Sequence, residues 1–239
     1  MSIRPLFTLD NRLKACAGMV PPGAKLADIG TDHAYLPVWL VRSQKIEQAL
    51  ACDLRPGPLE RAKQNVRRYQ VEDKIECRLS DGLDAVAPEE ADVIAIAGMG
   101  GELIARILQR APWVKEDKLL ILQPMTAAEQ LRRFLCGAGY ALLQEQAVCA
   151  DGKPYTVMCA RYHGAPRQQD PLYPYIGLLG DTPQQDASAG ACYIRKVIRD
   201  LENRRRGLIV QENQTEAEYL LAVVERLRAM LPEQEGING

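Results

Sequence analysis

The sequence lacks the features of a membrane, secreted or metal-binding protein. None of its apolar runs approaches the roughly 20 residues that cross a bilayer, and its first residues do not form a signal peptide. It contains seven cysteines without a C-x-x-C pair and only two histidines, which argues against a metal site. We therefore expect a cytoplasmic protein with reduced thiols, no bound metal and no membrane contact.

Neither sign of charge dominates, because 30 Lys and Arg residues balance 31 Asp and Glu residues. A balanced total neither predicts nor excludes a polyanionic partner, so only local patches can indicate one. The 239 residues are enough for one α/β domain of about 150 to 170 residues and a small appendage. No feature of the composition indicates a protein partner.

Apolar runs typical of strands alternate with helical patterns over the first two thirds of the chain. Strands are predicted at 25–29, 48–53, 74–79, 91–97 and 118–123. Helices are predicted at 12–20 with Asp10 as its cap, at 36–43, from Pro58 to Tyr69, at 102–110, and at 127–136 with Thr126 as its cap, while Pro124 stops the fifth strand. Two last strands, at 141–148 and 155–160, flank an Asp-Gly turn signal. This order predicts an α/β Rossmann-like methyltransferase fold, with a seven-stranded, mostly parallel sheet between helices and an antiparallel hairpin at its edge.

The stretch from Leu26 to Pro37 joins the first strand to a helix through an acid, a glycine and a polar cluster. Such a turn brings backbone N–H groups and a small residue close to a nucleotide. Asp32 and Tyr35 stand where the dinucleotide fingerprint needs glycines, and a carboxylate there would repel a pyrophosphate. The turn therefore favours S-adenosylmethionine over a dinucleotide, with an ordinary strand–helix corner as the alternative.

Acids follow the next two strands at the same end of the predicted sheet. Asp53 comes 23 residues after Gly30, where an acid can accept hydrogen bonds from both ribose hydroxyls, and Asp81-Gly82 falls where an adenine edge would reach. A surface acid that simply ends a strand is the alternative. The predicted cofactor-binding residues are Asp28, Gly30, Thr31, Asp53, Leu54, Asp81, Gly82 and Gly98.

Glycines at positions 98, 100 and 101 follow the apolar fourth strand, with Met99 among them. Glycines at the tip of a central strand remove side chains from the place where a substrate approaches. We therefore assign Met99, Gly100 and Gly101 to the substrate, although a tight turn without function would look the same.

The composition changes after Tyr162, and we place a boundary there between a catalytic domain at 1–162 and a connecting segment with an arm at 163–239. Apolar residues from 194 to 231 recur mostly at spacings of three and four, which predicts two helices in an antiparallel, coiled-coil-like hairpin linked by 211–215. Its first helix is basic, which suits a phosphate backbone but is also common on a solvated face. The cations assigned to the substrate are Arg195, Lys196, Arg199, Arg204 and Arg205.

Four stretches resemble the bacterial TrmK family: Asp28–Pro37, Arg55–Pro58, Ser80–Leu83 and Ala97–Gly101, followed by the helical hairpin. The resemblance covers essentially the whole chain and is most specific in the first and last of these stretches. It implies methylation of N1 of the adenine at position twenty-two of tRNA, with S-adenosylmethionine as the methyl donor and the basic helix as part of a tRNA-binding arm.

The chemistry that this resemblance implies needs little acid or base catalysis. Adenine N1 carries a lone pair and can attack a methyl group directly, so catalysis consists mostly of alignment and charge placement. Because N1 lies on the Watson–Crick edge, we expect the base to be extruded into a slot at Gly98–Gly101. Asp32 is predicted to accept from the exocyclic amine or to stabilise the developing charge, and His33 to hold the turn rather than act as a base. The alternatives are methylation of another RNA, a protein or a metabolite, and a non-catalytic RNA-binding protein; a nicotinamide oxidoreductase fits poorly.

Overall fold

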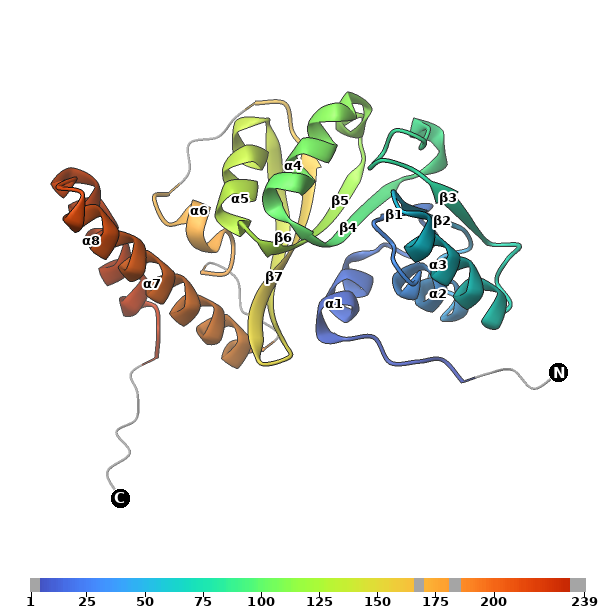
Figure 1. The fold of residues 1–239 in the computed structure, drawn as a ribbon, viewed down its shortest axis with the longest axis horizontal. Coiled ribbons are helices and arrows are strands. Elements are labelled where there is room, and N and C mark those ends of the chain that lie inside the picture. The colour runs from blue at the N-terminus through green and yellow to red at the C-terminus, as the bar shows by residue number, and fades with distance from the viewer. Residues whose placement is uncertain (1–4, 166–169, 181–185, 233–239) are drawn as a thin grey trace, which may run out of the picture.

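In the computed structural model, which describes residues 5–165, 170–180 and 186–232, seven strands form one sheet in the order β3-β2-β1-β4-β5-β7-β6 (Figure 1). The strands are β1 (Leu26–Ile29), β2 (Ala49–Asp53), β3 (Ile75–Leu79), β4 (Val93–Gly100), β5 (Leu119–Thr126), β6 (Tyr140–Ala150) and β7 (Lys153–Tyr162). Strands β1 to β5 are parallel, and β7 runs antiparallel to β5 and β6. The predicted mostly parallel, Rossmann-like sheet is therefore confirmed.

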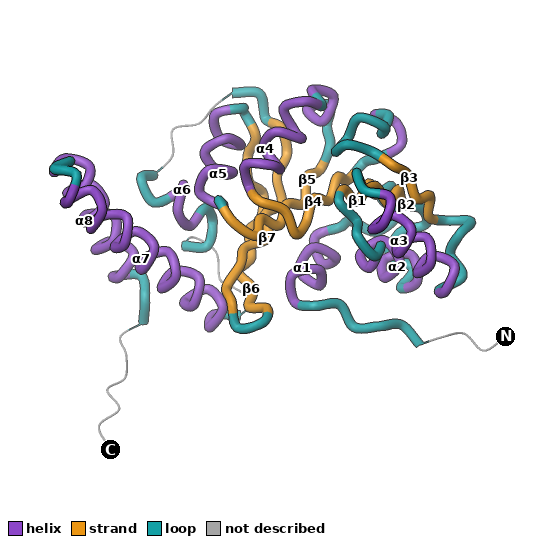
Figure 2. Tube along the Cα trace, viewed as in Figure 1, coloured by secondary structure: helices purple, strands orange, loops and turns teal. Residues whose placement is uncertain are grey.

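Helices cover both faces of the sheet (Figure 2). They are α1 (Asn11–Met19), α2 (Tyr35–Arg42) and α3 (Pro56–Arg68) on one face, and α4 (Gly101–Arg110) and α5 (Ala128–Gly137) on the other, with short 3-10 turns at Pro88–Glu90 and Pro112–Lys115. Alternate residues of β4 join the two cores: Val93 packs with α1 to α3, and Ile94 packs with α4 and α5. This two-sided burial explains the almost continuous apolar run of that strand.

The end of β5 differs from the prediction in two ways. Pro124 does not stop the strand, which continues to Thr126, because the facing β4 is irregular there and its register shifts on both sides of Met99. A missing N–H is tolerated where the ladder is already broken. Thr126 does not cap the next helix either: it belongs to the strand, and α5 begins after Ala127, which has a left-handed backbone and no side-chain cap.

The hairpin and the helical arm follow the prediction closely. Asp151 and Gly152 both have positive φ angles, 50° and 70°, as a tight turn between β6 and β7 requires. Beyond them come the short α6 (Tyr173–Ile176) and two long antiparallel helices, α7 (Ala187–Val210) and α8 (Gln214–Ala229), which project from the β6 side of the sheet (Figure 1). We call these two helices the arm. The division of the chain at residue 162 stays a prediction.

A fully buried ion pair joins the arm to the sheet. Arg132 of α5 donates to Glu145 of β6 at 2.7 Å, and neither side chain has any exposed surface. Arg132 also donates to the hydroxyl of Tyr193 on α7 at 3.0 Å and to the carbonyl of Tyr175 on α6 at 2.8 Å, while Glu145 accepts from Thr156 of β7 at 2.7 Å. The side chains of α5, β6, β7 and α7 thus meet at one polar junction.

All seven cysteines are free thiols, and Cys52 and Cys159 are buried in the core, as expected for small core residues. Within 5–165, 170–180 and 186–232, no helix is long and apolar enough to span a bilayer. The same residues include no group of three or more His, Cys, Asp and Glu side chains that could hold a metal ion.

Candidate active site

A cavity of about 590 Å³ opens at the carboxyl ends of β1 to β4, where the order of the strands reverses between β1 and β4. Ligands of open α/β sheets bind at such a reversal, and this volume suits a nucleoside-sized ligand. The cavity is lined by every residue predicted to bind the cofactor or to act in catalysis, and by Met99. Gly100 and Gly101 do not line it, and no described residue of the arm does.

The turn after β1 is held tightly against β2. The backbone N–H groups of Gly30 and Thr31 both donate to the carbonyl of Cys52, at 2.8 and 2.9 Å. Gly30 has a φ of +74°, and a Cβ there would overlap the end of the Met99 side chain. The backbone angle favours a glycine at this position, and any side chain there would also have to displace the end of Met99.

Asp28 lies beneath this turn as a buried carboxyl that accepts a hydrogen bond of 2.5 Å from the Thr31 hydroxyl. Burial raises its pKa to about 6, the charge of Asp53 adds to the rise, and the Thr31 hydrogen bond opposes it. An acid kept in surroundings that disfavour its charge is typical of a functional site.

Asp53 ends β2 and is only 5% exposed, although it borders the cavity. Its Oδ1 accepts from the backbone N–H of Arg55 at 2.8 Å, which fixes the carboxylate at the start of α3. Leu54 beside it is largely exposed and adds apolar surface to the cavity. An anchored acid next to an apolar side chain suits a ribose that carries a purine.

The loop after β3 is ordered by its own side chains and by α4. The Ser80 hydroxyl donates to the carbonyl of Gly82 at 2.9 Å, and Arg110 of α4 donates to Asp81 at 2.9 Å. Gly82 has a φ of +62°, and a Cβ there would press on Ile107 at 3.0 Å. The predicted Asp81-Gly82 pair is therefore held in a fixed conformation at the cavity wall.

Asp32 stands at the rim of the cavity with a φ of +42° and a half-exposed side chain. Arg61 of α3 donates to its Oδ1 at 2.7 Å, and the Nε2 atom of His33 lies 3.7 Å from its Oδ2. The His33 ring also stacks on Tyr35, with 5.1 Å between ring centroids and an interplanar angle of 18°. The imidazole thus has contacts on two sides, with Asp32 and with Tyr35. The roles assigned to Asp32 and His33 both stay predictions.

The glycine cluster divides into two parts in the structure. Gly98 has a φ of +79° and donates its N–H to Oε1 of Gln123 at 3.0 Å, at the cavity. Gly101 is buried instead, and a Cβ there would overlap the carbonyl of Ala127. Packing of the start of α4 against the start of α5 therefore explains the glycine at 101. The assignment of Gly100 and Gly101 to the substrate stays a prediction.

Sequence reasoning missed three polar residues of the site: Arg12, Arg61 and Gln123. Arg12 of α1 lines the cavity, pairs with Asp10 at 2.8 Å and lies 5.5 Å from the centre of the Tyr155 ring. Its Nε atom is buried without a hydrogen-bond partner among the described residues. The only signal in the sequence was the Asp10 cap, which places Arg12 in the first turn of a helix.

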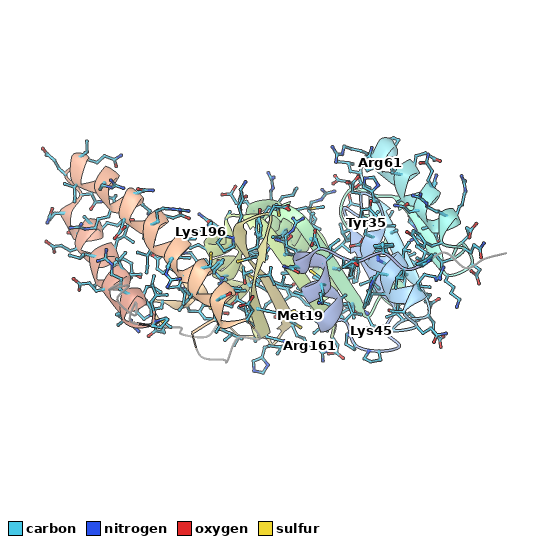
Figure 3. The ribbon with its side chains drawn as sticks, turned by 90° about the horizontal axis from the view of Figure 1, so that it is seen from below. Met19, Tyr35, Lys45, Arg61, Arg161 and Lys196 are labelled. Carbon is cyan, nitrogen blue, oxygen red and sulfur yellow. The ribbon has the colours of Figure 1, made fainter. Side chains whose placement is uncertain are left out.

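The basic residues of the arm differ in their exposure and in their ion pairs. Arg204 pairs with Glu129 of α5 at 3.5 Å and with Glu216 of α8 at 2.9 Å, and Lys196 pairs with Asp200 at 3.0 Å. Arg205 is partly buried, whereas Arg195 and Arg199 are exposed. Figure 3 shows Lys196 on the arm, well apart from the labelled Tyr35 and Arg61 near the cavity. A single ligand that contacts both the arm and the cavity must therefore be large.

Comparisons with known proteins agree with this site. Residues 9–158 match the family described as Methyltransferase domain. The chain is 37% identical over 200 residues to the tRNA (adenine(22)-N(1))-methyltransferase of Bacillus subtilis, with 82% of each chain covered.

Two solved structures extend the likeness to the arm. The crystal structure of the B. subtilis m1A22 tRNA methyltransferase TrmK superposes with a TM-score of 0.81 at 30% identity, covering 95% of this chain and all of that one. A Streptococcus pneumoniae structure in complex with S-adenosyl-L-methionine gives a TM-score of 0.78 at 29% identity, over 94% of this chain and 100% of the other. A match of this length, which includes both the cavity and the arm, assigns the chain to the TrmK family of tRNA (adenine(22)-N(1))-methyltransferases.

Proposed function

We propose that the protein methylates N1 of adenine 22 in tRNA with S-adenosylmethionine as the methyl donor, as the name of its B. subtilis relative states for that enzyme. One observation carries the proposal most directly: the anchored acid Asp53, the Gly30 turn and the open Gly98 all border one cavity. When bound there, the cofactor supplies an electrophilic methyl group on a sulfonium centre.

The residues of the cavity fit this cofactor. Asp53 is placed to accept from the ribose hydroxyls, and the loop at Asp81 to meet the adenine edge. Arg12 lines the cavity, and its guanidinium, which already pairs with Asp10, can also pair with the carboxylate of the cofactor. The Gly30 turn presents backbone without a side chain to the part of the cofactor between its ribose and its carboxylate.

On the substrate side the protein has to align the base rather than deprotonate it. A neutral adenine N1 attacks through its lone pair, and positive charge then develops on the ring. The exposed carboxylate of Asp32 can accept from the exocyclic amine or stabilise that charge. Arg61 holds this carboxylate at the rim, and we assign it a positioning role. Replacing Asp32 by Ala should lower turnover more than cofactor affinity, as single-turnover kinetics and calorimetry would show; equal, small effects on both would remove Asp32 from the mechanism.

The arm supplies the second contact with tRNA in this proposal. Arg195 is exposed on α7 and suits a phosphate contact. Arg199 is also exposed and suits one, although its Nε atom lies 4.0 Å from Asp200, whereas Lys196 and Arg204 form shorter ion pairs. Arg205 is partly buried and contributes less. A cytoplasmic location follows from the proposed substrate.

The direct test is to treat bulk tRNA with the protein and methyl-labelled S-adenosylmethionine and to map the modified adenines. Label at N1 of adenine 22 supports the proposal. The matched control is an Asp53→Ala variant, shown by circular dichroism to be folded, which should lose the ribose contact and transfer less label. Label at another adenine or in another RNA would point to a different target on the same fold. A protein that binds tRNA but neither binds the cofactor nor transfers label would be the non-catalytic alternative.

A further inference from the structure

An aromatic ring at the cavity has no part in the assignments above. Tyr35, the first residue of α2, lines the cavity and is 41% exposed. Figure 3 shows it on the same side of the molecule as Arg61, whose guanidinium holds Asp32. Leu103 of α4 also lines the cavity and is exposed to the same extent. Helices on both faces of the sheet therefore present exposed apolar side chains to this opening.

Neighbouring aromatic rings fix the orientation of Tyr35. Phe7 packs edge-on against it, with 5.2 Å between centroids and 62° between planes, and the His33 ring stacks on it at 5.1 Å. Phe7 is itself held edge-on by the buried Tyr69 at 5.1 Å. Ala34, with a φ of +54°, sets the direction in which the helix starts. These neighbours hold the ring and cover part of it, while the residue as a whole stays 41% exposed.

An exposed and fixed aromatic ring is the surface that nucleobases use in proteins that bind unpaired nucleotides. Stacking on it does not depend on the edge of the base, which leaves the edge free for a hydrogen-bonding group. Asp32 is such a group, three positions before Tyr35 in the same turn. The ring and the carboxylate can therefore contact the face and the edge of one base.

We propose that Tyr35 is the stacking platform for the adenine that receives the methyl group, an inference that rests on the proposed function. The ring holds the plane of the base at the cavity while Asp32 contacts its edge. Only the aromatic face is required, so Phe can replace Tyr at this position and an aliphatic residue of similar size cannot.

The test combines variants of the protein with variants of the RNA. Tyr35→Phe and Tyr35→Leu are compared with the wild type for tRNA binding, for kcat/KM of methyl transfer and for affinity toward S-adenosylmethionine alone. Each protein is also titrated with a tRNA in which the target nucleotide is abasic. Circular dichroism establishes that both variants are folded.

The expected result is a drop in kcat/KM of about 5- to 150-fold for Tyr35→Leu and of less than about threefold for Tyr35→Phe, with unchanged affinity for the cofactor. Tyr35→Leu should also weaken binding of intact tRNA but not of the abasic tRNA, since the partner of the ring is then missing. Equal losses with both RNAs, or a loss of cofactor affinity, would overturn the role of Tyr35 while leaving the proposed function intact. A wild-type enzyme that binds the cofactor but methylates no tRNA would instead refute the proposed function.

Discussion

The buried pair of Arg132 and Glu145 gives the sharpest prediction on stability. Burial alone would lower the pKa of Arg132, but Glu145 and Tyr193 outweigh it and raise that pKa above its usual value, so the guanidinium stays charged. Replacing Glu145 by Leu leaves this charge without a partner in a site with no exposed surface. Loss of one partner of a buried ion pair costs about 3 to 5 kcal/mol, a large part of the roughly 5 to 15 kcal/mol that stabilises a typical domain.

A double-mutant cycle separates the charge effect from the loss of packing. Arg132→Met with Glu145→Leu removes both charges, so the double variant should lose about 2 to 4 kcal/mol less than the sum of the two single variants. The free energies of unfolding come from urea titrations followed by circular dichroism. Asp200→Ala breaks the exposed pair with Lys196 and is the control, with an expected loss below about 1 kcal/mol. A Glu145→Leu variant as stable as this control, or strictly additive losses, would refute the reasoning.

Three further predictions follow from the site. Burial raises the pKa of Asp28 from its ordinary 3.8 to about 6, so the folded protein binds more protons between these pH values. Its free energy of unfolding should therefore fall by at most about 3 kcal/mol as pH rises from about 4 to 6, and urea titrations of Asp28→Asn should lack this slope. Gly101→Ala should lower the free energy of unfolding by about 1 to 3 kcal/mol, because the added Cβ overlaps backbone. Gly57→Ala places its Cβ in open space and should be nearly neutral in the same urea titrations. Arg12→Ala should weaken the binding of S-adenosylmethionine by about 10- to 150-fold in calorimetry. It should leave the binding of 5′-methylthioadenosine, which has no carboxylate, unchanged; equal losses for both ligands would show that Arg12 does not pair with the carboxylate.

The fold could be predicted from the sequence wherever a local pattern and the global arrangement agree. The apolar run of β4 and the Asp-Gly turn of the hairpin are such cases, since burial on both faces and a positive φ each leave a direct trace in the sequence. Pro124 and Thr126 were misjudged because the local rules for strand ends and helix caps yielded to pairing with β4 across its irregular segment. That pairing depends on a strand distant in the sequence, so the residues next to Pro124 do not indicate it.

The site was predictable where residues follow strands, because the order of the strands brings their carboxyl ends together. Asp53 and Asp81 were found in this way. Arg12 and Arg61 were not, since both come from helices and meet partners far away in the chain. Arg12 lines the cavity and lies over the Tyr155 ring, and Arg61 contacts Asp32 at the rim. The ion pair of Arg204 with Glu129 of another helix was hidden for the same reason.

Helix α5 helps to set the distance between the cavity and the arm. Its start packs against Gly101, the first residue of α4, which follows the strand that borders the cavity, and one turn later it carries Arg132, which donates to Tyr193 of α7. The N-terminal half of α5 therefore contacts both Gly101 and the arm, and together with Glu145 of β6 and Thr156 of β7 it fixes the span between cavity and arm. Under the proposed function, a fixed span means that an RNA held on the arm presents to the cavity only a nucleotide at the matching distance.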